Sequence, residues 1–148
     1  MDGHVADAAD AIMSIRPNYA QAILAGTKTI ELRRRVPDLF SGMRLWIYET
    51  LPTGAVVGFA RVQSVAKARP TTIWRKHRDA VGIDYASFTA YFDGAPEAVA
   101  IGLATASRVA PITLDQLRQV RDSFHPPRVL MRLTPAESKV LRKFAVAA

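Results

Sequence analysis

The chain has 148 residues, of which 49% are apolar and none is cysteine, and its formal net charge is +7 at pH 7. This length and composition predict one globular domain with its own core, and they exclude disulfide scaffolds, thiol nucleophiles and thiolate zinc sites. The charge favours a polyanionic partner such as nucleic acid. The sequence has no recognisable signal peptide and no apolar run near the roughly 20 residues of a membrane-spanning helix. We therefore expect a cytoplasmic protein that does not bind membranes.

The first part of the chain predicts a tail, a strand and a helix. Residues 1–11 are small and acidic and are expected to form a loose tail ahead of a single domain over residues 12–148. Residues 12–16 predict a strand. Pro17 then suits the first turn of a helix, and Gly26 suits its end.

The strand after Gly26 is unusually polar on one face. Strand alternation turns Ile30 and Leu32 to one side, and it turns four polar side chains to the other: Thr29, Glu31, Arg33 and Arg35. Lys28 lies in the turn before the strand and can lean over the polar face. Together these side chains predict a compact site for anion binding or acid–base chemistry.

The remaining elements suggest a mixed architecture. Strands over residues 43–49 and 55–67 should form a meander with the preceding strand. Further along the chain we expect helices over 71–77 and 84–92, a strand over 98–110, a helix after a capping box at Thr113 and Gln116, a strand over 129–133, and a last helix capped by Thr134 and Glu137. Mostly antiparallel strands interrupted by short helices predict an α+β fold, a small mixed β-barrel with surrounding helices.

The polar strand and its flanks resemble the ASCH domain family, whose hallmark is a Gly-x-Lys-x-x-Glu-x-Arg pattern. Here Gly26, Lys28, Glu31 and Arg33 fill the four positions, and the similarity continues to Pro126-Pro127, over nearly the whole chain. The resemblance implies a PUA-like fold, in which a small β-barrel and its first helix border a cleft. By position, it places Lys28, Glu31 and Arg33 in that cleft.

The resemblance implies several functions and does not choose among them. PUA-like modules bind RNA and modified bases, and ASCH proteins include hydrolases of acetylated cytidine, ribonucleases and simple nucleic-acid binders. We expect binding of RNA or another single-stranded nucleic acid in a basic cleft, with recognition of a modified base as one form of it. The alternatives are a metal-independent ribonuclease or amidohydrolase acting on RNA or acetylated cytidine, and a transcription cofactor that binds a protein partner. Against the amidohydrolase, Glu31 stands where that branch has its threonine nucleophile.

Seven residues are expected to contact nucleic acid: Arg16, Lys28, Arg33, Arg35, Arg44, Trp46 and Tyr48. Lys28 is assigned to phosphate, and Arg33 to a bidentate contact with phosphate or a base edge. Four aromatic side chains are candidates for stacking on an unpaired base: Trp46, Tyr48, Trp74 and Tyr91. The alternative is that they pack beneath the helices, and Arg35 could equally end its strand in solvent.

Cleavage of RNA without a metal needs a base for the 2′-hydroxyl, an acid for the leaving oxygen and a cation for the phosphate. Glu31 is the candidate base, His125 or Tyr48 the acid, and Lys28 the cation. In the structural alternative, Lys28 and Glu31 form an ion pair that only fixes the turn. The histidines are far apart in sequence and have no carboxylate at ligand spacing, so we expect neither a metal site nor a cofactor.

Overall fold

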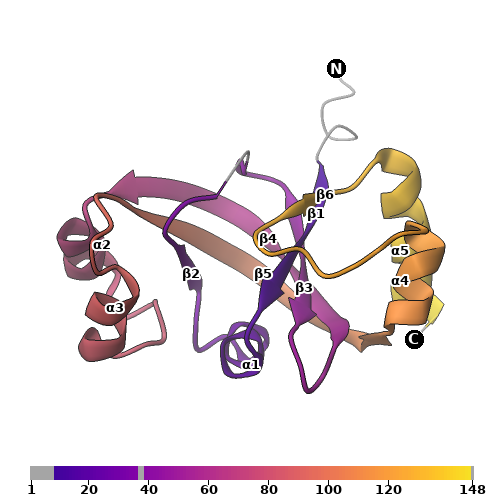
Figure 1. Ribbon diagram of the computed structural model, residues 1–148, viewed down its shortest axis with the longest axis horizontal. Helices are drawn as coiled ribbons and strands as arrows, with labels where there is room; N and C mark the ends of the chain where they lie inside the picture. Colours follow the sequence, from indigo (N-terminus) through magenta and orange to yellow (C-terminus); the bar gives the residue numbers. More distant parts are fainter. Residues whose placement is uncertain (1–8, 37–38, 148) are drawn as a thin grey trace.

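The computed structural model describes residues 9–36 and 39–147, which form a six-stranded sheet and five helices (Figure 1). The strands are β1 (Asp10–Ile15), β2 (Ile30–Arg33), β3 (Arg44–Glu49), β4 (Ala55–Ala68), β5 (Ala98–Ile112) and β6 (Met131–Arg132). The helices are α1 (Pro17–Ala25), α2 (Pro70–His77), α3 (Tyr85–Tyr91), α4 (Leu114–Val120) and α5 (Pro135–Ala147). The α+β class is confirmed.

The sheet is mixed and open, so the expected closed barrel is wrong for the described residues. The strand order is β2-β5-β4-β3-β1-β6; β1 and β3 are parallel and the other pairs are antiparallel. Closure would need a ladder between the edges, but β6 is only two residues long and pairs with Ala11 and Ile12 alone. A side-chain hydrogen bond links β2 to β1: Arg33 donates from Nη2 to the carbonyl oxygen of Ser14 at 2.8 Å.

The expected meander is also only partly present. β3 and β4 pair as expected, but β2 pairs with β5 instead of β3. The reason lies in the apolar side of β2, where Ile30 and Leu32 are buried with Ile73 of α2 and Phe88 of α3. Because α2 and α3 directly precede β5 in the chain, β2 finds its core partners and its strand partner in the same region.

Local sequence signals fix most element boundaries. Gly26 ends α1 with a left-handed φ of 84°, and Asp84 caps α3 by accepting a bond from the backbone N–H of Ser87. The capping box before α4 is present as expected. β1 begins at Asp10, so the last two residues of the expected tail lie in the first strand. Residues 1–8 lie outside the described part of the chain.

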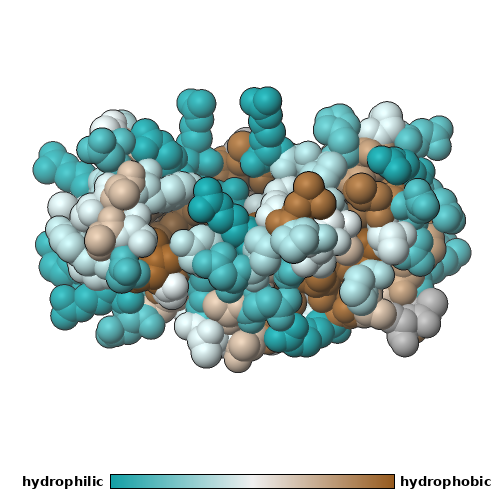
Figure 2. Space-filling model, turned by 60° about the horizontal axis from the view of Figure 1, so that its bottom comes forward, coloured by the Kyte–Doolittle hydropathy of each residue, from teal (hydrophilic) through white to brown (hydrophobic). Residues whose placement is uncertain are grey.

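Helices cover the sheet in three places. α2 and α3 lie at one end of the sheet, α4 and α5 at the other, and α1 between them (Figure 1). α1 packs on one face through Ala20 and Ile23, and α4 and α5 pack on the opposite face around Trp46. Figure 2 shows a largely hydrophilic surface on which hydrophobic residues form separate patches. No helix of the described residues is long and apolar enough to cross a membrane.

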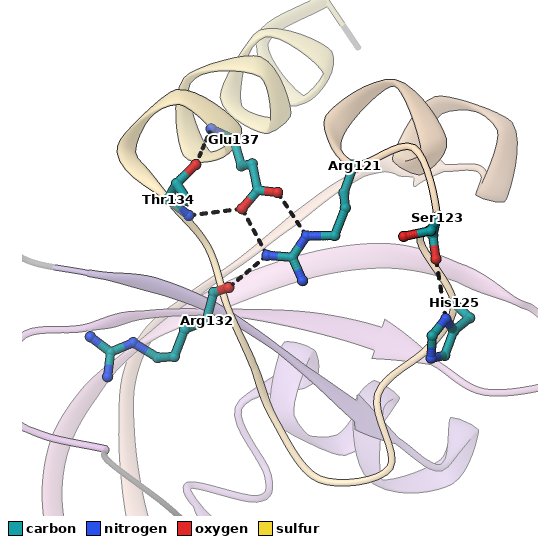
Figure 3. Close-up of polar contacts among 6 residues, drawn as sticks. All are labelled: Arg121, Ser123, His125, Arg132, Thr134 and Glu137. Carbon is teal, nitrogen blue, oxygen red and sulfur yellow. Dashed lines mark hydrogen bonds and ion pairs between the residues drawn. The ribbon is translucent and has the colours of Figure 1, made fainter.

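The segment between α4 and α5 is closed at its base by a pair of charged side chains (Figure 3). Arg121 donates from Nε and Nη2 to the two carboxylate oxygens of Glu137, at 2.7 and 2.8 Å. Nη2 also donates to the carbonyl oxygen of Arg132 at 3.0 Å, and Glu137 completes the expected capping box with Thr134. Residues 122–130, between α4 and β6, therefore form a loop whose two ends are held together.

Gly58 permits a close approach of three segments. A Cβ atom at Gly58 would lie 2.4 Å from the carbonyl oxygen of Ser107 and 2.5 Å from Cδ2 of Leu24. We expect Gly58→Ala to lower the free energy of unfolding by about 1–3 kcal/mol, because the backbone of β5 would have to shift. Gly102→Ala is the matched control: its Cβ would meet the rotatable Ser64 hydroxyl at 2.4 Å, so it should cost less in urea unfolding. Equal losses would contradict this explanation.

Glu137→Gln is expected to lower the free energy of unfolding by about 1–3 kcal/mol near neutral pH. The hydrogen bond from Arg121 is the largest cause that lowers the pKa of Glu137 from 4.5 to about 2. Because the folded pKa is depressed, the stabilisation is complete above the unfolded pKa and is lost as the pH falls towards 2.

Urea unfolding of both proteins at neutral and acidic pH checks this linkage. The gap between the wild type and the Glu137→Gln variant should narrow as the solution becomes more acidic. Arg118→Gln removes an exposed pair with Asp115 on α4 and serves as the control, with little effect expected at any pH. A Glu137→Gln deficit that stays constant with pH would count against the linkage.

Candidate functional site

A cavity of about 820 Å³ lies where β1, α1, β2, α3 and the loop after α4 meet. Its charged lining combines the expected residues with one new arginine: Arg16, Lys28, Glu31, Arg33 and Arg128. Its aromatic lining consists of Tyr19 and Tyr91. Four cations and one carboxylate make the lining positive, which suits an anionic ligand.

The turn after α1 aims Lys28 inward. Gly26 reverses the chain, and the backbone N–H of Lys28 donates to the carbonyl oxygen of Ala22 at 3.1 Å. The next two N–H groups, of Thr29 and Ile30, donate to the carbonyl oxygen of Ala80. The short turn is thus held both to the helix it leaves and to the segment after α2, so the position of Lys28 is fixed by backbone bonds.

Lys28 is buried, with 2% of its surface exposed. Its ammonium donates to the carbonyl oxygen of Val81, lies 3.7 Å from Oε1 of Glu31, and lies 5.0 Å from the ring centroid of Tyr19. Gly82 covers the stem, since a Cβ there would come within 3.0 Å of Lys28 Cβ and Cγ. Burial lowers the pKa of Lys28, and the charge of Glu31 opposes this shift.

Glu31 joins the two cations of the hallmark pattern. Its side chain is 6% exposed, and Oε2 accepts a bond from Nε of Arg33 at 3.0 Å and lies 2.8 Å from Nη2. Because Nη2 also donates to the carbonyl oxygen of Ser14, the Glu31–Arg33 pair links β2 to β1 in the lining of the cavity. An exposed pair that only fixed the turn would not bury Lys28 and Glu31 in a cavity wall beside Arg33, so this arrangement favours a ligand site over the structural alternative.

The loop after α4 forms the opposite wall. Pro126, Pro127 and Arg128 line the cavity, and the Ser14 hydroxyl donates to the carbonyl oxygen of Pro127 at 2.7 Å. The bond from Ser14 fixes this part of the loop, while the Arg121–Glu137 pair fixes its base. Arg128 therefore lies on a loop that is held by the Ser14–Pro127 bond and by the Arg121–Glu137 pair.

Trp46 and Tyr48 do not form the expected stacking platform. They share a strand face, as alternation predicted, but α4 and α5 cover that face. Trp46 has no exposed surface and donates from Nε1 to Oδ2 of Asp10 at 2.9 Å, while Tyr48 is 3% exposed. Burial also raises the pKa of the Tyr48 hydroxyl. The alternative prediction is therefore correct for Trp46 and Tyr48, because both side chains pack beneath helices.

The structure separates other expected residues from the cavity. His125 is exposed, and its Nδ1 lies 3.1 Å from the carbonyl oxygen of Ser123 (Figure 3). The two residues after it line the cavity, but His125 does not. Arg35 is also exposed outside the cavity lining. Arg44 lies on the face with Trp46. The structure therefore does not bring Tyr48 or His125 together with Lys28 and Glu31 as a proton donor.

Sequence reasoning missed several residues of the cavity. Tyr19 belongs to the predicted first helix, and its place two residues after Pro17 is the signal that could have aimed it at the polar strand. Arg128 follows the Pro126-Pro127 pair, but nothing local shows that this loop returns to β1. Among residues 9–36 and 39–147, no group of three or more histidine or acidic side chains could hold a metal ion.

Comparisons with known proteins agree with the sequence pattern. The ASCH domain model matches residues 13–120. A Zymomonas mobilis protein named ASCH domain-containing ribonuclease is 34% identical over 137 residues, which are 93% of each chain. The crystal structure of ASCH from Zymomonas mobilis has a TM-score of 0.88, with 34% identity over 90% of this chain and 94% of that one. A hypothetical protein from Leishmania major shares the fold, with a TM-score of 0.61 at 13% identity over 97% of this chain and 98% of its own. The chain belongs to the ASCH domain family.

Proposed function

We propose that the protein binds single-stranded RNA, with part of the strand in the cavity. The observation that carries the proposal is the linked set of buried Lys28, buried Glu31 and partly exposed Arg33 in the wall of a cavity that Arg16 and Arg128 also line. Guanidinium groups bind phosphate in bidentate geometry, and Lys28 supplies a point charge. The ribonuclease name of the Zymomonas mobilis relative supports RNA as the nucleic acid.

The aromatic residues of the cavity give a base somewhere to pack. Tyr91 is 41% exposed and Tyr19 is half-buried, so both rings have surface available at the cavity. Stacking on an aromatic ring contributes about 1–3 kcal/mol per base and tolerates any base. This assigns stacking to Tyr19 and Tyr91 in place of Trp46 and Tyr48. Recognition of a modified base would use the same cavity.

Ribonuclease activity is the second candidate function, favoured by the name of the relative and by the burial of Lys28. Because burial lowers the pKa of Lys28, a larger fraction of this side chain is in the neutral amine form than for an ordinary lysine. The neutral amine can take the proton of a 2′-hydroxyl. The 2′-oxygen then attacks phosphorus, the 5′-oxygen leaves with a proton from solvent, and a cyclic phosphate remains. Arg33 would stabilise the charge that develops on the phosphate oxygens.

Binding through about four phosphates of a single strand predicts a log–log salt slope near −3. Fluorescence anisotropy with labelled single-stranded RNA at several salt concentrations measures it. Arg128→Gln should weaken binding and reduce the slope by about 0.7, since one phosphate contact is removed. Arg118→Gln, on the exposed side of α4, is the matched control and should leave both quantities unchanged. Affinity that does not depend on salt would overturn the proposal, and absence of RNA binding even at low salt would favour a protein partner.

Lys28→Ala is expected to abolish RNA cleavage while the fold survives, because Glu31 keeps its pair with Arg33. If Lys28 is the base, the wild-type rate should rise with pH through its lowered pKa, since the neutral amine is the active form. Pure protein is incubated with single-stranded RNA, duplex RNA, DNA and acetylated cytidine, with and without a chelator. Arg35→Gln is the control outside the cavity. Cleavage by the Lys28→Ala variant would show that Lys28 is not the base. If the wild type leaves every substrate intact, the protein binds RNA without cleaving it.

A further inference from the structure

We propose that Arg44, Arg61 and Arg142 form a second phosphate-binding surface, which holds an RNA strand outside the cavity on the opposite face of the sheet. This inference rests on the proposed function, because it assigns a second contact region to the same ligand. The three arginines are called the outer arginine row below. None of them lines the cavity.

Strand register places the outer arginine row. Asp10, Arg44 and Arg61 are direct partners across β1, β3 and β4, so the three side chains share one face of the sheet. Trp46 and Phe59 are also direct partners, two residues along the same strands, and their face is the one that α4 and α5 cover. Glu31 is the partner of Ile101, which belongs to the core on the α1 side. The row and the cavity are therefore on opposite faces.

Within residues 9–36 and 39–147, the row carries more positive charge than the carboxylate bonded to it neutralises. Asp10, whose side chain is 1% exposed, is the acidic partner, and Arg142 occupies it with bonds of 2.6 Å to Oδ1 and 3.3 Å to Oδ2. Trp46 donates to the same carboxylate. Arg61 donates to a neutral acceptor, the carbonyl oxygen of Gly42, at 3.1 Å. In the described part of the chain, three guanidinium groups thus share one carboxylate, which is already bonded to Arg142 and Trp46.

Arg44 packs against two aromatic rings at the inner side of the row. Its guanidinium carbon lies 4.4 Å from the ring centroid of Phe59 and 5.7 Å from that of Trp46, so packing on aromatic rings fixes its position. Its Nε is buried and has no hydrogen-bond partner among the described residues. Burial, followed by the charges of Arg142 and Arg61, lowers the pKa of Arg44. A bound anion would relieve this repulsion.

A phosphodiester backbone fits this chemistry. Like charges directly opposite on neighbouring strands are destabilising, so the Arg44–Arg61 pair costs stability that a bound anion offsets. Guanidinium groups match the geometry of phosphate oxygens, and Arg61 and Arg142 are both exposed. A strand whose one end occupies the cavity can continue over the surface of the protein to the outer row. Such a strand must be longer than one that fills the cavity alone.

The test compares short and long single-stranded RNA. Labelled oligonucleotides of about 4 and about 16 nucleotides are titrated with the full chain at several salt concentrations. The Arg44→Gln/Arg61→Gln variant should bind the long RNA more weakly, with a salt slope smaller by about 1.4, and should bind the short RNA like the wild type. Arg142 is left in place because it neutralises buried Asp10. Arg61→Gln alone should reduce the salt slope for the long RNA by about 0.7. Because Arg61 is exposed, this single variant keeps the test valid if the double variant does not fold.

Controls separate this inference from the proposed function. Lys67→Gln/Arg118→Gln removes the same charge at exposed positions outside both sites and should leave binding of either RNA unchanged. Arg128→Gln, in the cavity, should weaken both RNAs. An unchanged slope for the outer-row variants with the long RNA would overturn the second surface and leave the cavity proposal intact, and so would equal weakening of both lengths. Failure of the wild type to bind either RNA would overturn both proposals.

Discussion

The buried carboxylate of Glu31 is the constraint on which the candidate site depends. Taking Lys28 out of water is costly, and a negative charge 3.7 Å away repays part of that cost. The same carboxylate accepts from Arg33, whose guanidinium reaches Ser14 on β1. One acidic side chain therefore keeps two cations in the wall of the cavity and joins β2 to β1. The charged groups of the site and the link between β2 and β1 depend on the same contacts.

The surrounding segments are stabilised independently of that carboxylate. The Arg121–Glu137 pair holds the loop of the opposite wall at its base, and backbone bonds hold the turn at Lys28. The two walls come from segments about a hundred positions apart in the sequence, joined through Ser14 and Pro127. A change in the hallmark residues can therefore alter the chemistry of the cavity while the loop that faces it keeps its own contacts.

Much of this arrangement could be predicted because it is encoded locally. Pro17, Gly26 and strand alternation give the helix, the turn and the polar face, and the family pattern adds the cleft. What sequence could not supply is the second helical layer. Alternation places Arg44, Trp46 and Tyr48 on one face of the strand. Whether that face is exposed to solvent depends on α4 and α5, which lie much later in the sequence and pack against it. The open sheet was missed for a related reason, since nothing within β6 shows that its pairing with β1 stops after two residues.

The side-chain bridge between β1 and β2 has a mechanical consequence. In a closed barrel, a ladder of backbone hydrogen bonds would resist separation of two neighbouring strands. Here the bridge from Arg33 to Ser14 is one hydrogen bond from a charged donor, a contact of about 1.5–3 kcal/mol. A phosphate bound to Arg33 could replace this contact with a similar one, so ligand binding itself could loosen the link between the two strands.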